Sequence, residues 1–312
     1  ESIWEIDELP ERMVIIGGGF VGLELAQAFQ YLGSEVHLFE RGERVLKPAP
    51  KEISKKVEEN LQESGVTIHK QTSAKKFADD SLVVEQESGK TKEVDFDLIF
   101  ASIGRIANTD GIGLDRVGVE TTERGKLITD KYLRTTNKNI YACGDVVGQH
   151  QFTHATELHA SVILKNLFSP LKSKLNTDHI SWTMFTDPEV TVFGLSQDEL
   201  EERGVDYEIL ENDFSEDDRA IIEGYSAQSQ LKLFVDSKDK IRGGYIITRN
   251  SGEIAQELIL ANTEGLTVDQ LFNKTYPYPS ASRVNKNTIA GYMSKKLTDF
   301  KKKVLRSLYK IF

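Results

Sequence analysis

The apolar residues near the start of the chain predict a β-α-β unit. Residues 12–17, RMVIIG, form a short apolar run that ends in glycine, which is typical of a buried strand. We expect a helix from there to Tyr31, with Gly33 as its C-terminal cap. A second strand, a second helix and a third strand are expected at residues 35–40, 51–64 and 66–69.

A hairpin and a returning strand follow this unit. Residues 81–96 are expected to form a hairpin with its turn at Ser88–Gly89. Residues 97–104, DLIFASIG, are expected to be a buried strand. Because strands and helices alternate here, we predict a parallel sheet with helices on both faces.

The middle of the chain has shorter elements. Residues 139–146, NIYACGDV, predict a strand that ends at the pair Gly144-Asp145, and a helix is expected from about residue 154 to 167. Pro170 and the Lys/Ser stretch after it mark the expected boundary to the last part.

The last part of the chain, from about residue 178 to 293, is predicted to be α+β. Residues 231–236 and 241–248 alternate like antiparallel strands. Residues 251–262 predict a helix that Ser251 caps.

Composition limits the class of protein. The 312 residues are 39% apolar and 28% charged, which is ordinary for a soluble globular protein, and no apolar run approaches the roughly 18 residues that span a bilayer. The net charge of −10 argues against nucleic acid as a partner. The first residue is Glu rather than Met, so we expect a fragment or a processed chain.

A single cysteine, Cys143, leaves no internal disulfide or CxxC pair and fits a reducing cytoplasm. Because Cys143 falls in a predicted strand, we expect it to be a buried, inert thiol. His150, His154 and His159 with Glu157 match no standard ligand spacing, so no metal site is expected.

The C-terminal tail, residues 294–312, is basic, with a net charge of +6 against −16 for the remainder. Its apolar residues recur at helical spacing and predict a basic amphipathic helix. They are Leu297, Phe300, Val304, Leu308 and Ile311. We favour a helix that docks on the protein's own acidic body; contact with an anionic membrane surface or with an acidic partner is the alternative.

The glycines of the opening unit predict a dinucleotide site. Gly17, Gly19 and Gly22 form GxGxxG between a strand and a helix, and an acid, Glu40, stands 18 residues beyond Gly22. Such glycines allow a tight turn, a close approach of pyrophosphate and close helix packing. The helix N-terminus attracts phosphate.

Glu40 is expected to accept hydrogen bonds from a ribose hydroxyl and to repel a 2′-phosphate, so NADH is favoured over NADPH. Arg41 and Arg44 are the opposing signal, because nearby arginines hold 2′-phosphates. Asp145, at the end of its predicted strand, is a candidate to accept hydrogen bonds from a polyol; a turn aspartate is the alternative.

Five segments together resemble the flavoprotein disulfide reductases in order and in sequence. They are IIGGGFVGLE, ASIGRIAN, TTNKNIYACGDV, FTHATELHA and FTDPEVTVFGLS. The resemblance implies an α/β fold with a Rossmann-like NAD-binding domain at residues 10–107. It also implies a partial FAD-binding domain from residues 1–9 and 108–174, and an α+β dimerisation domain at residues 178–293.

The resemblance also implies residue roles. Gly17, Gly18, Gly19, Phe20, Val21, Gly22 and Glu40 would bind NAD, and Ala74 would touch the adenine. Gly104 would lie near the nicotinamide nucleotide and Glu24 would face the flavin. Asp145 would hold the ribityl chain of FAD, and Thr153 would present backbone to the flavin ring at a helix N-terminus.

The chain departs from the family in three places. The family's N-terminal half, with its FAD pyrophosphate motif and its CxxxxC pair, is not in this sequence, so retention of FAD by this chain is doubtful. Tyr278 and Arg283 stand where a His and a Glu relay a proton in the family. The cysteine pair that ends mercuric reductases is missing, which argues against mercury chemistry.

These observations predict an NADH:flavin oxidoreductase, homodimeric, that passes a hydride to flavin and on to a disulfide or another acceptor, which the sequence does not identify. Tyr278 would act there as a hydrogen-bond donor or only in packing. The alternative is a non-catalytic NAD-binding or assembly scaffold anchored by the tail.

Overall fold

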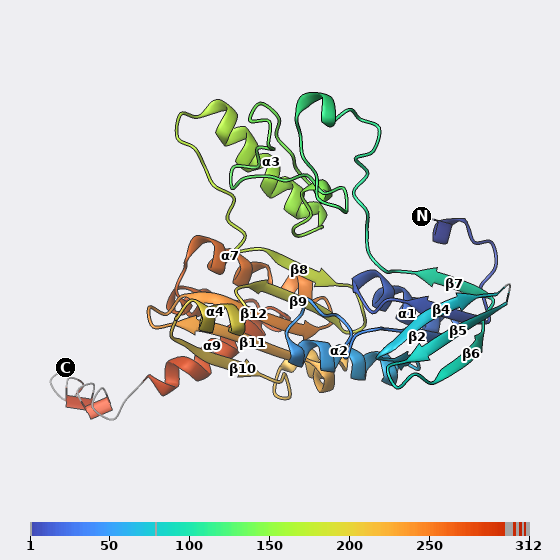
Figure 1. Cartoon of the computed structure of the whole chain (residues 1–312). Coiled ribbons are helices and arrows are strands. Elements are labelled where there is room, and N and C mark those ends of the chain that lie inside the picture. The colour runs from blue at the N-terminus through green and yellow to red at the C-terminus, as the bar shows by residue number, and fades with distance from the viewer. Residues whose placement is uncertain (1, 79, 297–301, 304–305, 308, 310–312) are drawn as a thin grey trace. The chain divides into compact units, whose positions relative to one another are not determined.

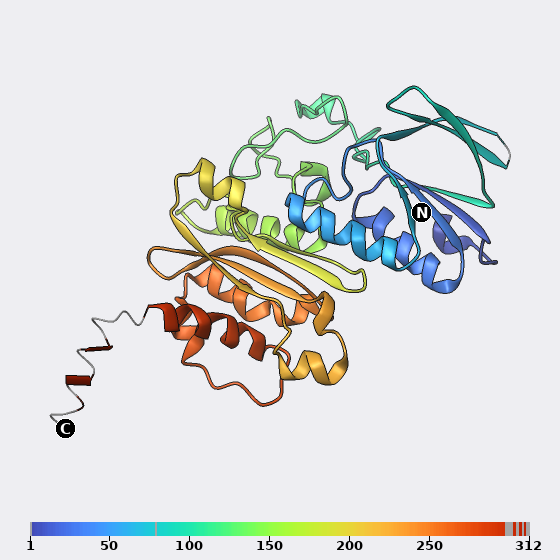
Figure 2. The same cartoon turned by 90° about the horizontal axis from the view of Figure 1, so that it is seen from below.

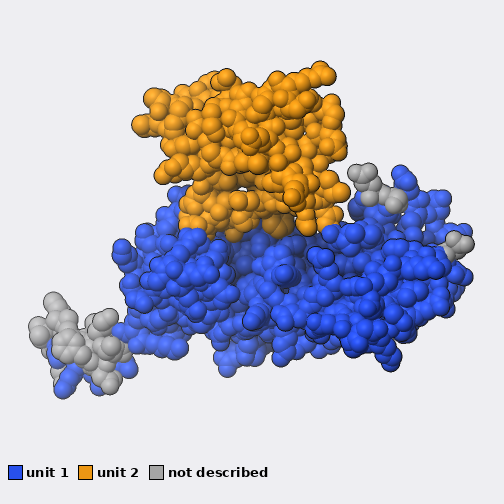
Figure 3. Space-filling view, in the orientation of Figure 1, with its two compact units in different colours: residues 1–103, 181–312 blue, residues 104–180 orange. Residues whose placement is uncertain are grey.

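A computed structural model describes residues 2–78, 80–296, 302–303, 306–307 and 309. These residues form two compact units, coloured in Figure 3. Unit 1 combines an N-terminal α/β region (residues 12–101) with a C-terminal α+β region (residues 181–295), and unit 2 comprises residues 104–180. Within the part of the chain described, no helix is long and apolar enough to cross a membrane.

The N-terminal α/β region contains a parallel sheet in the order β3-β2-β1-β7. β1 lies between β2 and β7, with Val14 opposite His37 on one side and Ile99 on the other. The elements are β1 Arg12–Ile16, α1 Phe20–Leu32, β2 Glu35–Phe39, α2 Lys51–Glu63, β3 Thr67–His69, β4 Thr72–Phe77, β5 Ser81–Gln86, β6 Thr91–Asp95 and β7 Leu98–Ala101. The predicted strands, helices and hairpin of this region are therefore confirmed, whereas β4 was not predicted.

The two faces of this sheet are covered differently. Met13 and Ile15 of β1 pack in one core with α1 and α2. Val14 points to the other face and packs against Leu82 and Val84 of β5, which belongs to the antiparallel meander β4-β5-β6 (Figure 1). The prediction of helices on both faces is therefore wrong, because the second apolar face of the sheet is buried by strands.

Gly33 ends α1 as expected. Its φ of +110° is a left-handed conformation, which favours glycine. The N–H of Gly33 donates to the carbonyl of Gln30, and that of Ser34 donates to the carbonyl of Phe29. These bonds satisfy carbonyls of the last helical turn and direct the chain into β2.

Unit 2 contains one long helix, α3 Thr153–Phe168, and short 3-10 turns, among them Asp145–Val147. The strand predicted at residues 139–146 is not formed. A strand needs a neighbour to pair with, and among the described residues the segment 139–146 makes only a single bridge, Arg134 to Tyr141. Cys143 is consequently exposed, so the prediction of a buried thiol is also wrong.

The C-terminal α+β region is built on an antiparallel sheet in the order β10-β11-β12-β9-β8. Its elements are β8 Ser181–Met184, β9 Glu189–Gly194, α4 Gln197–Glu202, β10 Tyr207–Asn212, α5 Asp218–Glu223, β11 Gln230–Asp236, β12 Ile241–Thr248, α6 Ser251–Ile254, α7 Gln256–Glu264, α8 Val268–Phe272 and α9 Arg283–Lys295. Ser251 is the first residue of α6 rather than its cap, because its hydroxyl instead bonds that of buried Thr191 at 2.7 Å. The apolar residues of the predicted tail helix (Leu297, Phe300, Val304, Leu308 and Ile311) lie outside the described residues.

This sheet joins two cores. Ile246 of β12 packs in a core with α7 and α9, which cover one side of the sheet in Figure 2 (orange and red). Its neighbours Tyr245 and Ile247 point the other way and pack in the same core as Met13 and Leu23 of the N-terminal region. The two regions of unit 1 therefore share a continuous hydrophobic core.

Lys232 reinforces this joint. Its side chain is 8% exposed, and its Nζ lies 2.8 Å from Glu52 of α2 and 2.6 Å from Glu211 of β10. A buried cation with two carboxylate partners is strongly held, and its removal leaves like charges facing each other.

We expect Lys232→Met to lower the free energy of unfolding by about 2 kcal/mol; solvent screening of the half-exposed carboxylates keeps the loss below the 3–5 kcal/mol of a fully buried pair. Urea denaturation measures this value. Lys55→Met is the matched control, because its ion pair with Glu59 is exposed and should change stability by less than about 0.5 kcal/mol. Equal stabilities of the two variants would contradict the assignment.

His69 predicts a pH dependence. Its ring stacks on Phe39 at 4.5 Å and lies 3.1 Å from the ring of His37. Burial, followed by the charges of His37 and Lys92, lowers the pKa of His69. Below the unfolded pKa of about 6.5 the unfolded chain therefore binds more protons, so stability is lost as pH falls.

We expect His69→Phe, which keeps the stacking, to reduce the loss of thermal stability between pH 7 and pH 5. Thermal unfolding at a series of pH values measures this loss. Parallel curves for the variant and the wild type over that interval would show that His69 does not titrate as argued.

Candidate functional site

The turn between β1 and α1 requires glycine at two positions. Gly17 has φ +107°, and a Cβ on it would lie 2.4 Å from the carbonyl oxygen of Ser102, after β7. A Cβ on Gly22 would lie 2.1 Å from the carbonyl oxygen of Gly17. Larger residues would separate the helix from the sheet at this point.

Gly19 differs from these two glycines. Its backbone is extended, with φ −88°, and no described atom lies within 4 Å of where a Cβ would be. Gly19 caps α1 without a side-chain bond, so the first N–H groups of the helix face the space in front of it. A helix N-terminus with an open approach is suited to a pyrophosphate.

Glu40, directly after β2, is oriented by two backbone N–H groups. Gly18 donates to Oε2 at 2.8 Å and Gly42 donates to Oε1 at 2.7 Å. A carboxylate has about four acceptor positions, so two remain for ribose hydroxyls. The structure thus places the predicted acid beside the glycine turn.

The two arginines near Glu40 do not form a clamp for a 2′-phosphate. Arg44 donates to the carbonyls of Ala49 and Lys47, both at 2.7 Å. Arg41 is exposed. The guanidinium of Arg44 is therefore occupied in shaping its own loop.

Glu24 and Gln27 of α1 reach the turn between β8 and β9. Glu24 Oε1 accepts from the N–H of Phe185 at 2.8 Å. Burial raises the pKa of Glu24, and the bond from Phe185 opposes part of that rise. Gln27 exchanges two hydrogen bonds with the backbone of Asp187, of 2.9 and 2.6 Å.

Ala74 lies on β4, partly buried against Val14 and Phe39. The strand starts next to Glu40, because the N–H of Thr72 donates to the Glu40 carbonyl at 3.0 Å. Ala74 is thus two residues along the strand from the acid.

Three further candidates belong to unit 2: Gly104, expected near the nicotinamide nucleotide, and Asp145 and Thr153, expected near FAD. Gly104 is exposed, with φ +124°. Asp145 is half-exposed, and its Oδ2 accepts from Arg105 at 2.8 Å. Thr153 is the first residue of α3, a 16-residue helix that no side chain of the described chain caps. A carboxylate and a helix N-terminus fit part of a flavin site.

Tyr278 lies in the C-terminal region and is 66% exposed. The hydrogen bond to Asp218, together with the charge of that carboxylate, raises the pKa of Tyr278. The guanidinium of Arg283 lies 5.5 Å from the centre of its ring. Tyr278 therefore stays protonated at neutral pH and is a donor rather than a base.

A partly buried carboxylate, Glu257, holds the segment around Tyr278 in place. Glu257 of α7 accepts from the hydroxyl of Tyr276 at 2.9 Å and from Asn285 Nδ2 at 2.7 Å. Glu257 therefore binds one residue on each side of Tyr278.

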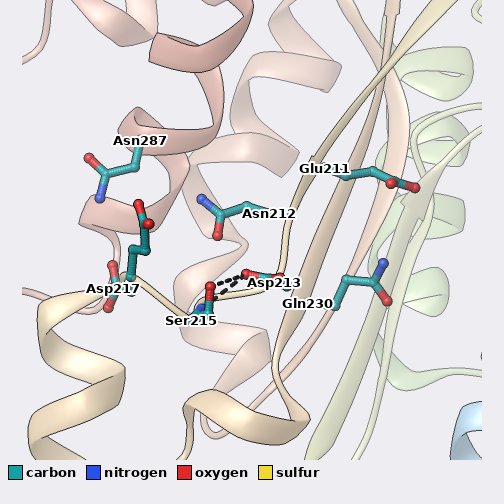
Figure 4. A pocket seen from close by; sticks show the side chains of 8 residues that line it. Glu211, Asn212, Asp213, Ser215, Asp217, Gln230 and Asn287 are labelled. Atoms are coloured by element: carbon teal, nitrogen blue, oxygen red, sulfur yellow. Dashed lines mark hydrogen bonds between the residues drawn. The ribbon is translucent and has the colours of Figure 1, made fainter.

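A depression of about 480 Å³ lies elsewhere, lined by β10, the loop that follows it, β11 and α9 (Figure 4). Carboxylates dominate its lining, and Asp213 accepts from both the N–H and the hydroxyl of Ser215. Its other lining residues are Glu211, Asn212, Glu216, Asp217, Gln230 and Asn287. Such a surface repels an anionic nucleotide. Among the residues described, no group of His, Cys, Asp or Glu is arranged for a metal ion.

Several contacts were not foreseen from the sequence. Ser102, Phe185 and Arg105 stand in the quoted segments ASIGRIAN and FTDPEVTVFGLS, but spacing alone does not reveal that they meet the glycine turn, Glu24 and Asp145. No sequence pattern indicated that Asp218 lies next to Tyr278, because the two residues are 60 positions apart in the sequence.

Comparison with known proteins decides the family. The model of the pyridine nucleotide-disulphide oxidoreductases matches residues 1–160, and the model of their dimerisation domain matches residues 180–288. The chain belongs to this family. The flavoprotein disulfide reductase fold expected from the sequence is thereby confirmed.

Two curated relatives support the family assignment. The mercuric reductase of Staphylococcus aureus is 30% identical over 282 residues, which are 89% of this chain and 51% of the relative. The dihydrolipoyl dehydrogenase of Chlamydia muridarum is 30% identical, over 91% of this chain and 60% of the relative. The chain thus spans little more than half the length of these curated relatives.

Two solved structures share the fold at 24% identity. The HOCl-induced flavoprotein disulfide reductase RclA of Escherichia coli has a TM-score of 0.83, over 92% of this chain and 66% of that one. LpdA of Mycobacterium tuberculosis has a TM-score of 0.84, over 93% of this chain and 63% of that one.

Proposed function

We propose that the whole protein uses NADH to reduce a bound flavin, and that this chain supplies the NADH site. The observation that carries the proposal is the glycine turn with Glu40 held at 2.8 Å from Gly18, next to an open helix N-terminus. In this arrangement the helix N-terminus suits the pyrophosphate, and the carboxylate of Glu40 suits a ribose hydroxyl. The occupation of Arg44 by two carbonyls supports NADH over NADPH.

In this proposal the residues 17–22 bind the pyrophosphate and Glu40 binds a ribose hydroxyl. Ala74 lines the adenine, and Gly104 lies near the nicotinamide nucleotide. Asp145 holds the ribityl chain of FAD, and the N-terminus of α3 at Thr153 stabilises negative charge near the flavin ring. The flavin, when bound, supplies a two-electron acceptor for the hydride of NADH.

The final acceptor is a disulfide or another oxidant that reacts with reduced flavin. Relatives named mercuric reductase and dihydrolipoyl dehydrogenase show that the family acts on different acceptors. We propose that Tyr278 donates a hydrogen bond near this step, because its raised pKa makes it a poor base. The match of residues 180–288 to the dimerisation domain supports a homodimer.

Anaerobic mixing of the full-length, FAD-loaded protein with NADH tests the function. We expect the visible absorption bands of the flavin to bleach. A flavin that stays oxidised while NADH binds would overturn the proposal and favour a non-catalytic NAD-binding scaffold.

A further inference from the structure

The turn that leads into Asp145 has a rare backbone conformation. Gly144 has φ +79° and ψ −156°, a region that is essentially open only to glycine. A Cβ on Gly144 would lie 3.2 Å from Oγ1 of Thr156, on α3. Such a conformation persists only where the surrounding structure holds it. The direction of the Asp145 carboxylate therefore depends on what holds Gly144.

His159 of α3 provides this hold. Its Nδ1 accepts a hydrogen bond from the N–H of Gly144 at 3.1 Å. The side chain belongs to the buried face of α3 and is 0% exposed. The bond therefore connects the turn before Asp145 to the helix that starts at Thr153, and these are the two elements proposed to contact FAD.

The protonation state of His159 follows from this contact. An N–H donor faces Nδ1, so Nδ1 carries no proton and the ring proton is on Nε2. Nε2 is buried, and no described residue accepts a hydrogen bond from it. Burial, followed by the charge of His150, lowers the pKa of His159. The ring is therefore neutral at neutral pH, and the neutral form is the one that accepts from Gly144.

This arrangement gains orientation rather than stability. A leucine at position 159 would remove the acceptor of the Gly144 N–H, whereas the histidine leaves its own Nε2–H without a partner. Each residue leaves one donor unpaired, and the costs are comparable. What only the histidine provides is a fixed acceptor for the turn.

We infer that His159 is a positioning residue of the FAD site, which sets the orientation of the Gly144-Asp145 turn relative to the N-terminus of α3. The inference rests on the proposed flavin function and deepens it. Asp145 contacts the ribityl chain in that proposal, whereas His159 acts only through the backbone of Gly144. A turn that is fixed before binding loses less conformational entropy when the ligand binds. Loss of the imidazole acceptor therefore weakens FAD binding.

Titration of the full-length protein, freed of its flavin, with FAD tests the inference, and the change in flavin fluorescence reports binding. We expect His159→Leu, which fills a similar volume without an acceptor, to weaken FAD binding about five- to tenfold. His159→Asn should stay within about twofold of wild type, because Oδ1 of asparagine can take the place of Nδ1 and accept from Gly144.

Asn166→Leu is the matched control. Asn166 is another buried polar residue of α3, 2% exposed, and exchanges two hydrogen bonds with the backbone of Ser173, of 2.9 and 2.7 Å. The variant removes a buried polar group from the same helix but leaves the acceptor of Gly144 in place. It should lower thermal stability and leave FAD affinity unchanged.

A double-variant cycle tests whether His159 acts through Asp145. Asp145→Ala should weaken FAD binding in the wild type, and by a clearly smaller factor in His159→Leu, because the turn is already misplaced there. Equal factors in the two backgrounds would show that His159 does not act through this carboxylate.

The outcomes separate the two proposals. Wild-type affinity of His159→Leu, equal losses in His159→Leu and His159→Asn, or an equal loss in Asn166→Leu would overturn the positioning role while leaving the flavin function intact. Failure of the wild-type full-length protein to bind FAD would overturn the proposed function, and the inference with it.

Discussion

Gly19→Ala will weaken NADH binding about 10- to 100-fold, while the free energy of unfolding changes by less than about 1 kcal/mol. The reason is that the fold leaves the space around Gly19 open: no described atom lies within 4 Å of an added Cβ, and the backbone is already extended. A methyl group there would obstruct the pyrophosphate and weaken its bonds to the helix N–H groups. Titration calorimetry with NADH and urea denaturation measure the two quantities.

Gly22→Ala is the matched control for the folded state. Its Cβ would lie 2.1 Å from the carbonyl oxygen of Gly17, so we expect this variant to lose stability as well as NADH binding. If Gly19→Ala kept wild-type affinity, the open space would not be the pyrophosphate site.

Glu40→Gln will reduce the preference for NADH over NADPH about tenfold or more. A hydrogen bond to a charged group contributes about 1.5–3 kcal/mol, so loss of the charge weakens the bond to the ribose hydroxyl. Repulsion of a 2′-phosphate is lost at the same time. The ratio of the two dissociation constants, measured by calorimetry, reports both effects.

Glu43→Gln controls for the change in net charge, because Glu43 is exposed on the same loop. It should leave the ratio unchanged. A wild-type chain that binds NADPH more tightly than NADH would contradict the role given to Glu40.

The sequence predicted the local geometry of the candidate nucleotide site because that geometry depends on local rules. A glycine turn, a helix stop at Gly33 and an acid at the end of the second strand each follow from backbone geometry within a few residues. The structure brings these parts together at hydrogen-bonding distance, as for Gly18 and Glu40. What the glycines alone could not show is that Gly17 and Gly22 serve the fold, whereas Gly19 leaves an open space.

The errors arise where burial depends on distant segments. Strand β4, TSAKKF, has few apolar residues, and Ala74 packs in a cluster formed with residues of other strands. The strand expected around Cys143 had a suitable apolar pattern but finds one bridge among the described residues. Ser251 has the chemistry of a cap, yet its hydroxyl bonds Thr191, 60 residues away. Contacts of this kind are set by tertiary structure, which a local pattern does not contain.

In the proposed function, the opening glycine turn delivers NADH to a flavin in the whole protein. Rapid anaerobic mixing of NADH with the full-length protein tests it most directly, with wild type and Gly19→Ala compared at equal FAD content and at an NADH concentration below saturation. We expect NADH to bleach the flavin of the wild type and the variant to react at least about tenfold more slowly, in proportion to its weaker binding. Equal rates for the two proteins would contradict it.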